Sequence, residues 1–228
     1  MKWIKFGKSV IWDTLLVLSV IFAAFILPVL PLAWQRSSFM AVYTIIYITA
    51  IVSLEDRSNY TILLFVVTVL LAWISTLLNL EIITIISKGV NIIYFLVIVY
   101  LLIKQIALAR EVTSAVILSS IAGYLLMGII FSIFIAFLMQ QDPTAFTPVN
   151  AGEAGPGEAI NVSLPLYFSF VTLASLGYGD VLPLKPYTRS LATFIVVSGQ
   201  FYIAIIVALL VGKFTAQQRR RNDNMEGG

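Results

Sequence analysis

The chain has 228 residues, of which 60% are hydrophobic and only 11% are charged, and its formal net charge is +3. At a mean hydropathy of +1.00 it has too little polar surface for a soluble globule of this size, so it is an integral membrane protein. It contains no cysteine and no histidine, which excludes disulfides, thiolate metal sites, haem ligation by either residue, and Ser-His or Cys-His catalysis.

Apolar runs follow one another along the chain, and we expect the long ones to span the membrane. A bilayer core of about 30 Å needs roughly 20 apolar residues per helix. A run of about half that length, 164–174, suits a segment that enters the membrane and turns back. The predicted fold is an all-α membrane protein with six transmembrane helices and this re-entrant segment. The six spans are 10–33, 38–54, 60–80, 82–103, 113–139 and 188–214, the second being the shortest.

The basic residues indicate how the chain is oriented. With a cytoplasmic N-terminus, six crossings place ten lysines and arginines inside and three outside, while Lys88 lies within the fourth span. We therefore expect a multi-pass protein of the plasma membrane, in a bacterium the inner membrane, with both termini cytoplasmic. The inner ten are Lys2, Lys5, Lys8, Arg57, Lys104, Arg110, Lys213, Arg219, Arg220 and Arg221, and the outer three are Arg36, Lys185 and Arg189.

The fourth span lacks the pattern of a voltage sensor, which needs several arginines at three-residue spacing. Its only basic residue is Lys88, and one charge that moves through 100 mV provides about 2.3 kcal/mol at most. We expect weak or no intrinsic voltage sensing. Glu81, Asn91 and Asp13 are candidate partners for Lys88, which either fixes helix packing or is a vestigial sensor or a proton-linked switch.

The segment 140–163 is the clearest break in composition, rich in proline and glycine, and is predicted to be an irregular loop outside the membrane. Its acidic residues Asp142, Glu153 and Glu158, together with Asp180, would modestly concentrate cations there. Asn161 begins the triplet NVS, a weak pattern for glycosylation that would mean nothing in a bacterial protein.

The re-entrant segment leads into SLGYGD, Ser175 to Asp180, where two glycines flank a tyrosine. Non-helical backbone at membrane depth is tolerated only where it is buried in protein or lines a water-filled path. Because glycine reaches positive φ, alternating glycines let successive carbonyls point the same way. Such a row can replace the water shell of a cation, and a ring of several copies would complete the cage.

The stretch TLASLGYGD, from Thr172 to Asp180, resembles the filter signature of the potassium-channel family, which is Thr-Val-Gly-Tyr-Gly-Asp after a pore helix that ends in threonine. Residues 164–212 look especially like the pore and final helix of small bacterial six-span channels of that family. Over the first four spans the likeness is only topological.

The resemblance implies a homotetrameric potassium channel that conducts K⁺ passively in a lipid bilayer. Its domains would be a peripheral module like that of voltage sensors (1–109), a pore module (110–216) and a cytoplasmic tail (217–228). It implies no enzymatic activity, no nucleic-acid partner and no cofactor other than the permeant potassium ions. The filter oxygens, four carbonyls and one hydroxyl, would come from Ser175, Leu176, Gly177, Tyr178 and Gly179, with K⁺ bound at Ser175, Leu176, Gly177 and Tyr178.

Several positions depart from the family pattern. Ser175 replaces threonine and loses the methyl that stiffens χ1, and Leu176 replaces valine behind the filter. Tyr167 and Phe168 replace two pore-helix tryptophans; the Tyr167 hydroxyl is expected to bond Asp180, whereas Phe168 has no donor. Thr172 remains the expected partner of Tyr178. With fewer braces, we predict a filter that inactivates more readily.

The last span contains a central glycine, Gly199, at the place where the family often has a gating hinge. The glycine is either a hinge or a site of close helix packing. Gln200 follows it, and this polar side chain should face the inner cavity or a neighbouring helix rather than lipid. Beyond the span, Arg219, Arg220 and Arg221 either anchor the topology or bind anionic lipid headgroups.

Other functions remain as alternatives. A non-selective monovalent cation channel would need the same architecture with a looser filter. An intramembrane aspartyl protease needs two apposed aspartates, and Asp13, the only other acid within a span, lies near the opposite face from Asp180. A secondary transporter would show a broken helix in each half of the chain, and only one half has one.

Overall fold

The computed structural model describes residues 3–54, 58–78, 81–109, 111–147 and 163–226. These residues are helical apart from the connecting segments, and the only strand-like pairing among them is an isolated bridge between Phe146 and Pro183. The predicted all-α class is therefore confirmed for the described part of the chain. In chain order the helices are α1 (Trp3–Ile21), α2 (Leu32–Ser53), α3 (Asn59–Leu78), α4 (Glu81–Leu108), α5 (Ser114–Gln141), α6 (Ser163–Leu173) and α7 (Pro186–Glu226).

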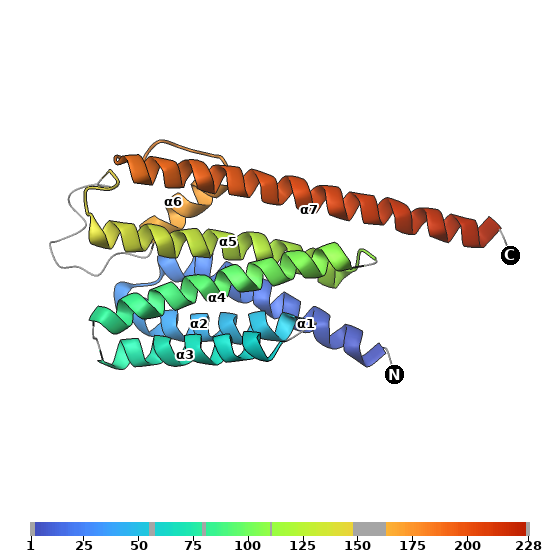
Figure 1. Cartoon of the computed structure of the whole chain (residues 1–228), viewed down its shortest axis with the longest axis horizontal. Helices are drawn as coiled ribbons and strands as arrows, with labels where there is room; N and C mark the ends of the chain where they lie inside the picture. Colours follow the sequence, from blue (N-terminus) through green and yellow to red (C-terminus); the bar gives the residue numbers. More distant parts are fainter. Residues whose placement is uncertain (1–2, 55–57, 79–80, 110, 148–162, 227–228) are drawn as a thin grey trace.

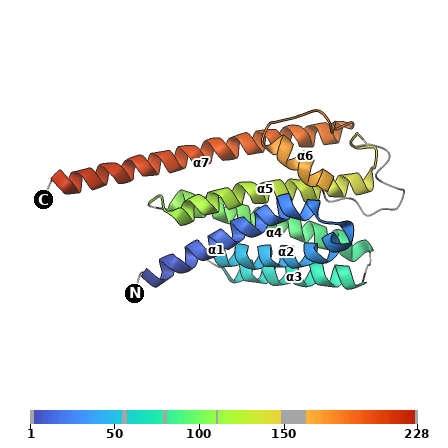
Figure 2. The same cartoon turned by 180° about the vertical axis from the view of Figure 1, so that it is seen from behind.

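Helices α1 to α5 lie alongside one another as a bundle, and the short α6 lies between α5 and α7 at one end of it (Figures 1 and 2). Helix α7 runs along the bundle and continues beyond it. The start of α1 and the end of α7 lie at the same end of the molecule, which we call the terminal end, and α6 lies toward the opposite end, the α6 end. An even number of crossings would produce this placement of the termini.

Prolines set several helix boundaries. Pro28 has no N–H for the carbonyl one turn earlier, and there α1 loosens into a π-helical turn (Phe22–Ile26) and a 3-10 turn (Leu27–Val29). Within this loosening the Leu27 N–H donates to the carbonyl of Phe22. Helix α7 begins at Pro186, whose fixed φ and missing N–H suit the first position of a helix.

The largest buried cluster lies among α1, α2, α4 and α5. At its centre are aromatic side chains of α2 and α4. The rings of Tyr47 and Tyr94 meet edge to face with centroids 5.3 Å apart, and the Tyr94 hydroxyl donates to the backbone carbonyl of Tyr47 at 2.8 Å. Phe95 is fully buried beside them. Helices α1, α2, α4 and α5 therefore share a side-chain core, against which α3 packs with partly buried side chains.

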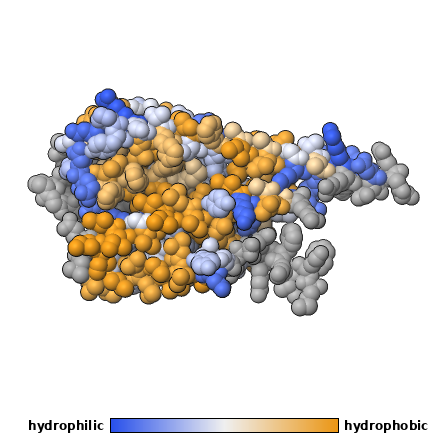
Figure 3. Space-filling model, in the orientation of Figure 1, coloured by the Kyte–Doolittle hydropathy of each residue, from blue (hydrophilic) through white to orange (hydrophobic). Residues whose placement is uncertain are grey.

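Four helical stretches in the described residues are long and apolar enough to cross a membrane: Val10–Val29, Ile82–Leu108, Ser114–Gln141 and Pro186–Arg219. The apolar stretches in α2 and α3, Ala41–Ser53 and Asn59–Ser75, are shorter. Six spans therefore remain a prediction, in which α2 and α3 supply the second and third crossings. Figure 3 shows an apolar band over the middle of one face, with hydrophilic side chains gathered mainly toward the ends.

Helices α4 and α7 continue well past the C-terminal ends of their predicted spans. Helix α4 continues to Leu108 and α7 to Glu226, whereas the apolar runs end at 103 and 214. Hydropathy locates the part of a helix that lies in lipid, but glutamine, arginine and lysine are also good helix formers and let a helix continue into water. The described residues of the predicted tail, 217–226, are consequently a continuation of α7.

Candidate functional site

Residues 175–179, which we call the filter segment, follow α6 with a backbone unlike that of a helix or strand. φ is +59° at Ser175, +55° at Gly177 and +79° at Gly179, so every second residue is left-handed. When left-handed residues alternate with ordinary ones, successive peptide planes turn so that their carbonyls face the same way. The positive φ expected at the two glycines is confirmed, and Ser175 extends the alternation by one step.

Ser175 is the only non-glycine residue with positive φ in the described part of the chain. Because this conformation costs an L-residue roughly 1–2 kcal/mol, its surroundings must hold it. The Ser175 N–H donates to the Thr172 carbonyl, and the Leu176 N–H donates to the Val171 carbonyl, both at 2.9 Å. The start of the filter segment is thus fixed to the last turn of α6.

The far end of the filter segment is braced by Asp180. The hydroxyl of Tyr167, on α6, donates to the Asp180 carboxylate, which is the hydrogen bond expected from the sequence. The other carboxylate oxygen accepts from the N–H of Val181 at 3.1 Å. Asp180 therefore links the helix before the filter segment to the turn after it.

Phe168 has a packing role in the structure. It is buried against Phe146, with ring centroids 5.1 Å apart and the planes inclined at 71°. Phe146 belongs to a short pairing of 145–147 with 182–184, in which the Thr147 N–H donates to the Leu182 carbonyl at 2.9 Å. This contact was not predicted, because neither segment has a strand-like sequence pattern.

Asp142 ends α5 and connects it to the start of α7. Its carboxylate accepts from the Thr144 hydroxyl and the Tyr187 hydroxyl, each at 2.7 Å, and from the Thr144 N–H at 2.9 Å. The Thr144 side chain first, and then that of Tyr187, hold the pKa of the Asp142 carboxyl below its usual value. Asp142 is therefore a brace as well as an exposed charge. Glu153, Glu158 and Asn161 lie outside the described residues.

The inner end of the filter segment contacts α7 directly. A Cβ at Gly199 would overlap the backbone carbonyl oxygen of Leu173, the last residue of α6. Next to this contact, the side-chain amide of Gln200 donates from Nε2 to the Ser175 hydroxyl at 2.8 Å. Close packing is thus the interpretation of Gly199 that this contact supports, and Gln200 points toward the filter segment.

Two further glycines, both in α5, make room for aromatic rings. At Gly128 the neighbour is Phe170 of α6, and at Gly123 it is Tyr202 of α7. The Ser169 hydroxyl donates to the Gly128 carbonyl at 2.6 Å. Neither glycine was predicted to have a role, although small residues within a membrane span are a signal of close packing.

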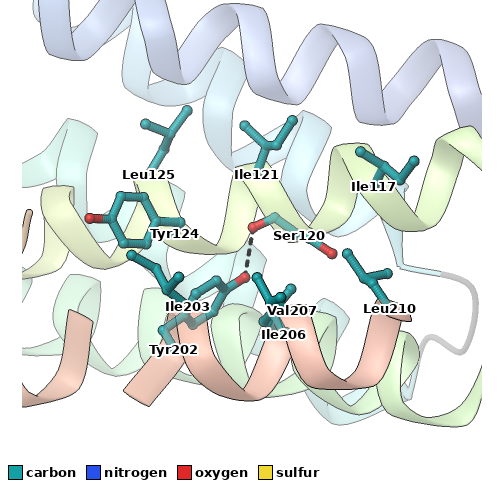
Figure 4. A pocket seen from close by; sticks show the side chains of 10 residues that line it. All are labelled: Ile117, Ser120, Ile121, Tyr124, Leu125, Tyr202, Ile203, Ile206, Val207 and Leu210. Atoms are coloured by element: carbon teal, nitrogen blue, oxygen red, sulfur yellow. Dashed lines mark hydrogen bonds between the residues drawn. The ribbon is translucent and has the colours of Figure 1, made fainter. Parts of the chain in front are cut away.

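The Tyr202 hydroxyl also donates to the backbone carbonyl of Ser120 at 2.7 Å, across the contact between α5 and α7. Beside this bond lies an apolar groove of about 290 Å³, whose lining residues are drawn in Figure 4. The groove follows both helices toward the terminal end, while nearer the α6 end the rings of Phe131 on α5 and Phe194 on α7 meet with centroids 6.0 Å apart.

Lys88 lies on α4 near the α6 end, and its ammonium donates to the side-chain carbonyl of Gln140 on α5. Of the partners considered for it, Asn91 donates instead to the hydroxyl of Tyr47, and the Glu81 side chain is outside the described residues. Asp13 is fully buried and accepts from the hydroxyls of Ser53 and Ser119, the latter at 3.4 Å. These bonds connect α4 and α1 to the two ends of α5.

Toward the terminal end, Lys213 of α7 forms hydrogen bonds with backbone carbonyls at the end of α4. Its ammonium donates to the carbonyls of Ala107 and Ala109, at 2.8 and 2.7 Å, and to that of Ile106. A cation is favourable there because the last carbonyls of a helix lack helical partners. Arg219 is exposed, and the side chains of Arg220 and Arg221 lie outside the described residues.

The filter segment is exposed in a single chain, with Leu176 at 57% and Tyr178 at 67%. Thr172 is buried at the end of α6, and its bond to Tyr178 stays a prediction. The structure thus brings Ser175, Gln200, Gly199 and the end of α6 together at the inner end of the filter segment. Tyr167 and Asp180 lie at its outer end.

A comparison with known protein families finds a match over part of the chain that includes these residues. A family model described as "Ion channel" matches residues 123–216, from the first α5 glycine through the filter segment and most of α7. No curated protein and no solved structure gave a significant match. The match indicates an ion channel, and the apolar helices support a membrane protein.

Proposed function

We propose that the protein is a potassium-selective channel that conducts K⁺ passively through the backbone carbonyls of Ser175 to Gly179. The observation that carries this proposal is the left-handed backbone at every second residue of the filter segment. It aligns a row of carbonyls, and such oxygens replace the hydration shell of a monovalent cation without any formal charge.

A complete site needs several copies of the chain, because one filter segment supplies only one wall. Cyclic symmetry closes such a ring, and we propose four copies, as the resemblance to potassium channels implies. The exposed filter segment supports this proposal, as do the large apolar side chains that α7 leaves uncovered. These include Phe194 at 60%, Phe201 at 64% and Val211 at 58% exposed.

The end of α6 adds to the attraction for cations. The C-terminus of a helix carries roughly half a negative charge from its unpaired carbonyls. Helix α6 ends at Leu173, two residues before the filter segment, so this negative end lies at the inner end of the conduction path. A cation there is stabilised without a carboxylate in the filter segment.

The first four helices would contribute little voltage dependence. Within the membrane part of α4, Lys88 is the only basic residue far from the terminal end, and it bonds Gln140 of α5. Moving one charge through 100 mV provides about 2.3 kcal/mol, so a steep response is not expected. We further propose that the terminal end faces the cytoplasm of a plasma membrane, because the basic side chains gather there.

Selectivity is tested by reconstituting the purified full-length chain in planar bilayers with K⁺ on one side and Na⁺ on the other. A reversal potential close to that of a K⁺ electrode supports the proposal. A reversal potential that does not distinguish the two ions indicates the non-selective cation channel instead. Cross-linking in lipid that yields only monomers, together with no current in any salt, contradicts both.

A further inference from the structure

We propose that Gln200 is a positioning residue for the inner end of the filter segment, where its amide holds the Ser175 hydroxyl so that this oxygen faces the permeant cation. The inference rests on the proposed function, because Ser175 has an ion to face only if the filter segment conducts. Its basis is the 2.8 Å hydrogen bond from Gln200 Nε2 to Ser175 Oγ, which joins residues 25 apart in the sequence.

Ser175 needs such a partner because little else fixes its side chain. It is exposed in the chain and lies in the left-handed region, with φ at +59°. Serine lacks the β-methyl with which threonine restricts χ1, so its hydroxyl can occupy several rotamers. In rotamers that turn the hydroxyl away from the path, an oxygen ligand is lost. A group outside the filter segment must therefore select the rotamer.

The local packing of α7 explains why Gln200 reaches Ser175. The preceding residue, Gly199, lies so close to the Leu173 carbonyl that a Cβ would overlap it. This approach brings the α7 backbone against the end of α6, two residues before Ser175. Gly199 thus sets the distance between α7 and the end of α6, and the Gln200 side chain reaches across the remaining distance to Ser175.

The chemistry of an amide suits this position. A serine hydroxyl has two acceptor lone pairs and one donor. One lone pair accepts the Gln200 N–H, and the other stays available to a cation. A lysine would place a fixed positive charge beside the path, and an ionised glutamate would accept a hydrogen bond rather than donate one. A neutral donor positions the hydroxyl without repelling or trapping the ion.

The test uses Ba²⁺ applied from the terminal side, because Ba²⁺ is close to K⁺ in size and is held by the same kind of oxygen ligands. We expect Gln200→Met, which keeps the length of the side chain but removes the donor, to weaken Ba²⁺ block about five-fold, the range for one lost hydrogen bond. Thr215→Val is the control, since that hydroxyl bonds the Val211 carbonyl within α7. It should leave block unchanged.

A second variant separates positioning from a merely structural role. In a Ser175→Thr background the β-methyl restricts χ1, so Gln200→Met should change Ba²⁺ block less than two-fold. Gln200→Asn keeps the amide on a shorter stem that cannot reach Ser175, and it should behave like Gln200→Met. If the Gln200→Met channel does not assemble, Ba²⁺ block of the Gln200→Asn channel tests the inference instead.

The outcomes also separate this inference from the proposed function. If the unmodified chain conducts K⁺ selectively but Ba²⁺ blocks Gln200→Asn and Gln200→Met as strongly as it blocks the unmodified chain, the inference is overturned. That result leaves the proposed function standing. An equal effect of Gln200→Met in the serine and threonine backgrounds also overturns it. If the unmodified chain carries no cation current, both are overturned.

Discussion

Helices α1, α2 and α4 pack around fully buried aromatic side chains, whereas α5, α6, the filter segment and α7 meet through glycines and hydrogen bonds. In the first region Tyr94 and Phe95 are 1% and 0% exposed, and neighbouring rings surround them. In the second, Gly128 and Gly199 let backbone and rings approach where no Cβ fits. Side-chain volume therefore stabilises the first region, and backbone position defines the second.

The difference affects how substitutions should act. A cavity in a side-chain core lowers stability but leaves distant backbone in place. A methyl added where backbones touch, or where φ is positive, displaces the atoms that the proposed function uses. We therefore expect the α1–α4 region to determine how much protein folds, and the second region to determine what the folded protein conducts.

Truncating Phe95 should produce the largest loss of stability. The ring is fully buried against Tyr47 and Tyr94, and phenylalanine-to-alanine changes in cores cost about 3–5 kcal/mol. Thermal unfolding in detergent should show this loss for Phe95→Ala, while the reversal potential of channels that assemble stays unchanged. Tyr100→Ala, on an α4 side chain that is 65% exposed, is the control. A shifted reversal potential would contradict the expectation that the core around Phe95 affects stability but not ion selectivity.

Gly199→Ala should cost about 1–3 kcal/mol, the usual range for overpacking. The added methyl would overlap the Leu173 carbonyl, and a backbone atom cannot turn aside as a side chain can. We expect lower thermal stability in unfolding experiments and a changed reversal potential in bilayer recordings. Gly212→Ala in the same helix is the matched control, since a Cβ there has no neighbour within 4 Å. If only the open probability changes and stability does not, Gly199 is a hinge.

Gly179→Ala should cost less energy and yet abolish selective conduction. At φ +79° a Cβ has no steric neighbour within its own chain, so the cost inside one copy is backbone strain, roughly 1–2 kcal/mol. That strain favours rotation of the peptide and removal of its carbonyl from the row. Bilayer recordings with intact assembly on a sizing column would check this. Normal K⁺ currents from the variant would show that the alternation of φ is not required.

The sequence predicted the features that depend on local residue type. Apolar run lengths located the helices, and the glycine spacing predicted positive φ at Gly177 and Gly179. The bond from Tyr167 to Asp180 was expected only through the resemblance to the potassium-channel family. Local residue type could not predict contacts between distant segments, such as Gln200 with Ser175 or Phe146 with Phe168, because no local pattern encodes which faces meet. The hydropathy pattern predicted that the last span ends at 214, whereas α7 continues to Glu226 because the residues beyond the membrane are also good helix formers.

Tyr167→Phe removes one brace of the filter segment and should have a moderate effect. The hydroxyl that bonds Asp180 is lost, while the ring and its contacts remain. Currents during a maintained stimulus should decay several-fold faster, with unchanged thermal stability. Tyr60→Phe is the control, because that ring is 82% exposed and belongs to α3, a helix that lies across the bundle from α6 (Figure 1). Equal decay in both variants would mean that Asp180 does not depend on Tyr167.

Acidification should weaken the link that the Asp142 carboxylate makes between the end of α5 and the start of α7. Because hydrogen bonds from Thr144 and Tyr187 lower the pKa of this carboxyl from its usual 3.8, the folded state binds its proton less readily than the unfolded state. The stabilisation is therefore fully present above about pH 4 and is lost as pH falls through the lowered pKa. Asp142→Asn cannot ionise, so its stability should lack this component of the acid dependence. Thermal unfolding of both proteins between pH 7 and pH 3 measures the difference. Parallel pH profiles would show that the link between α5 and α7 does not depend on the charge of Asp142.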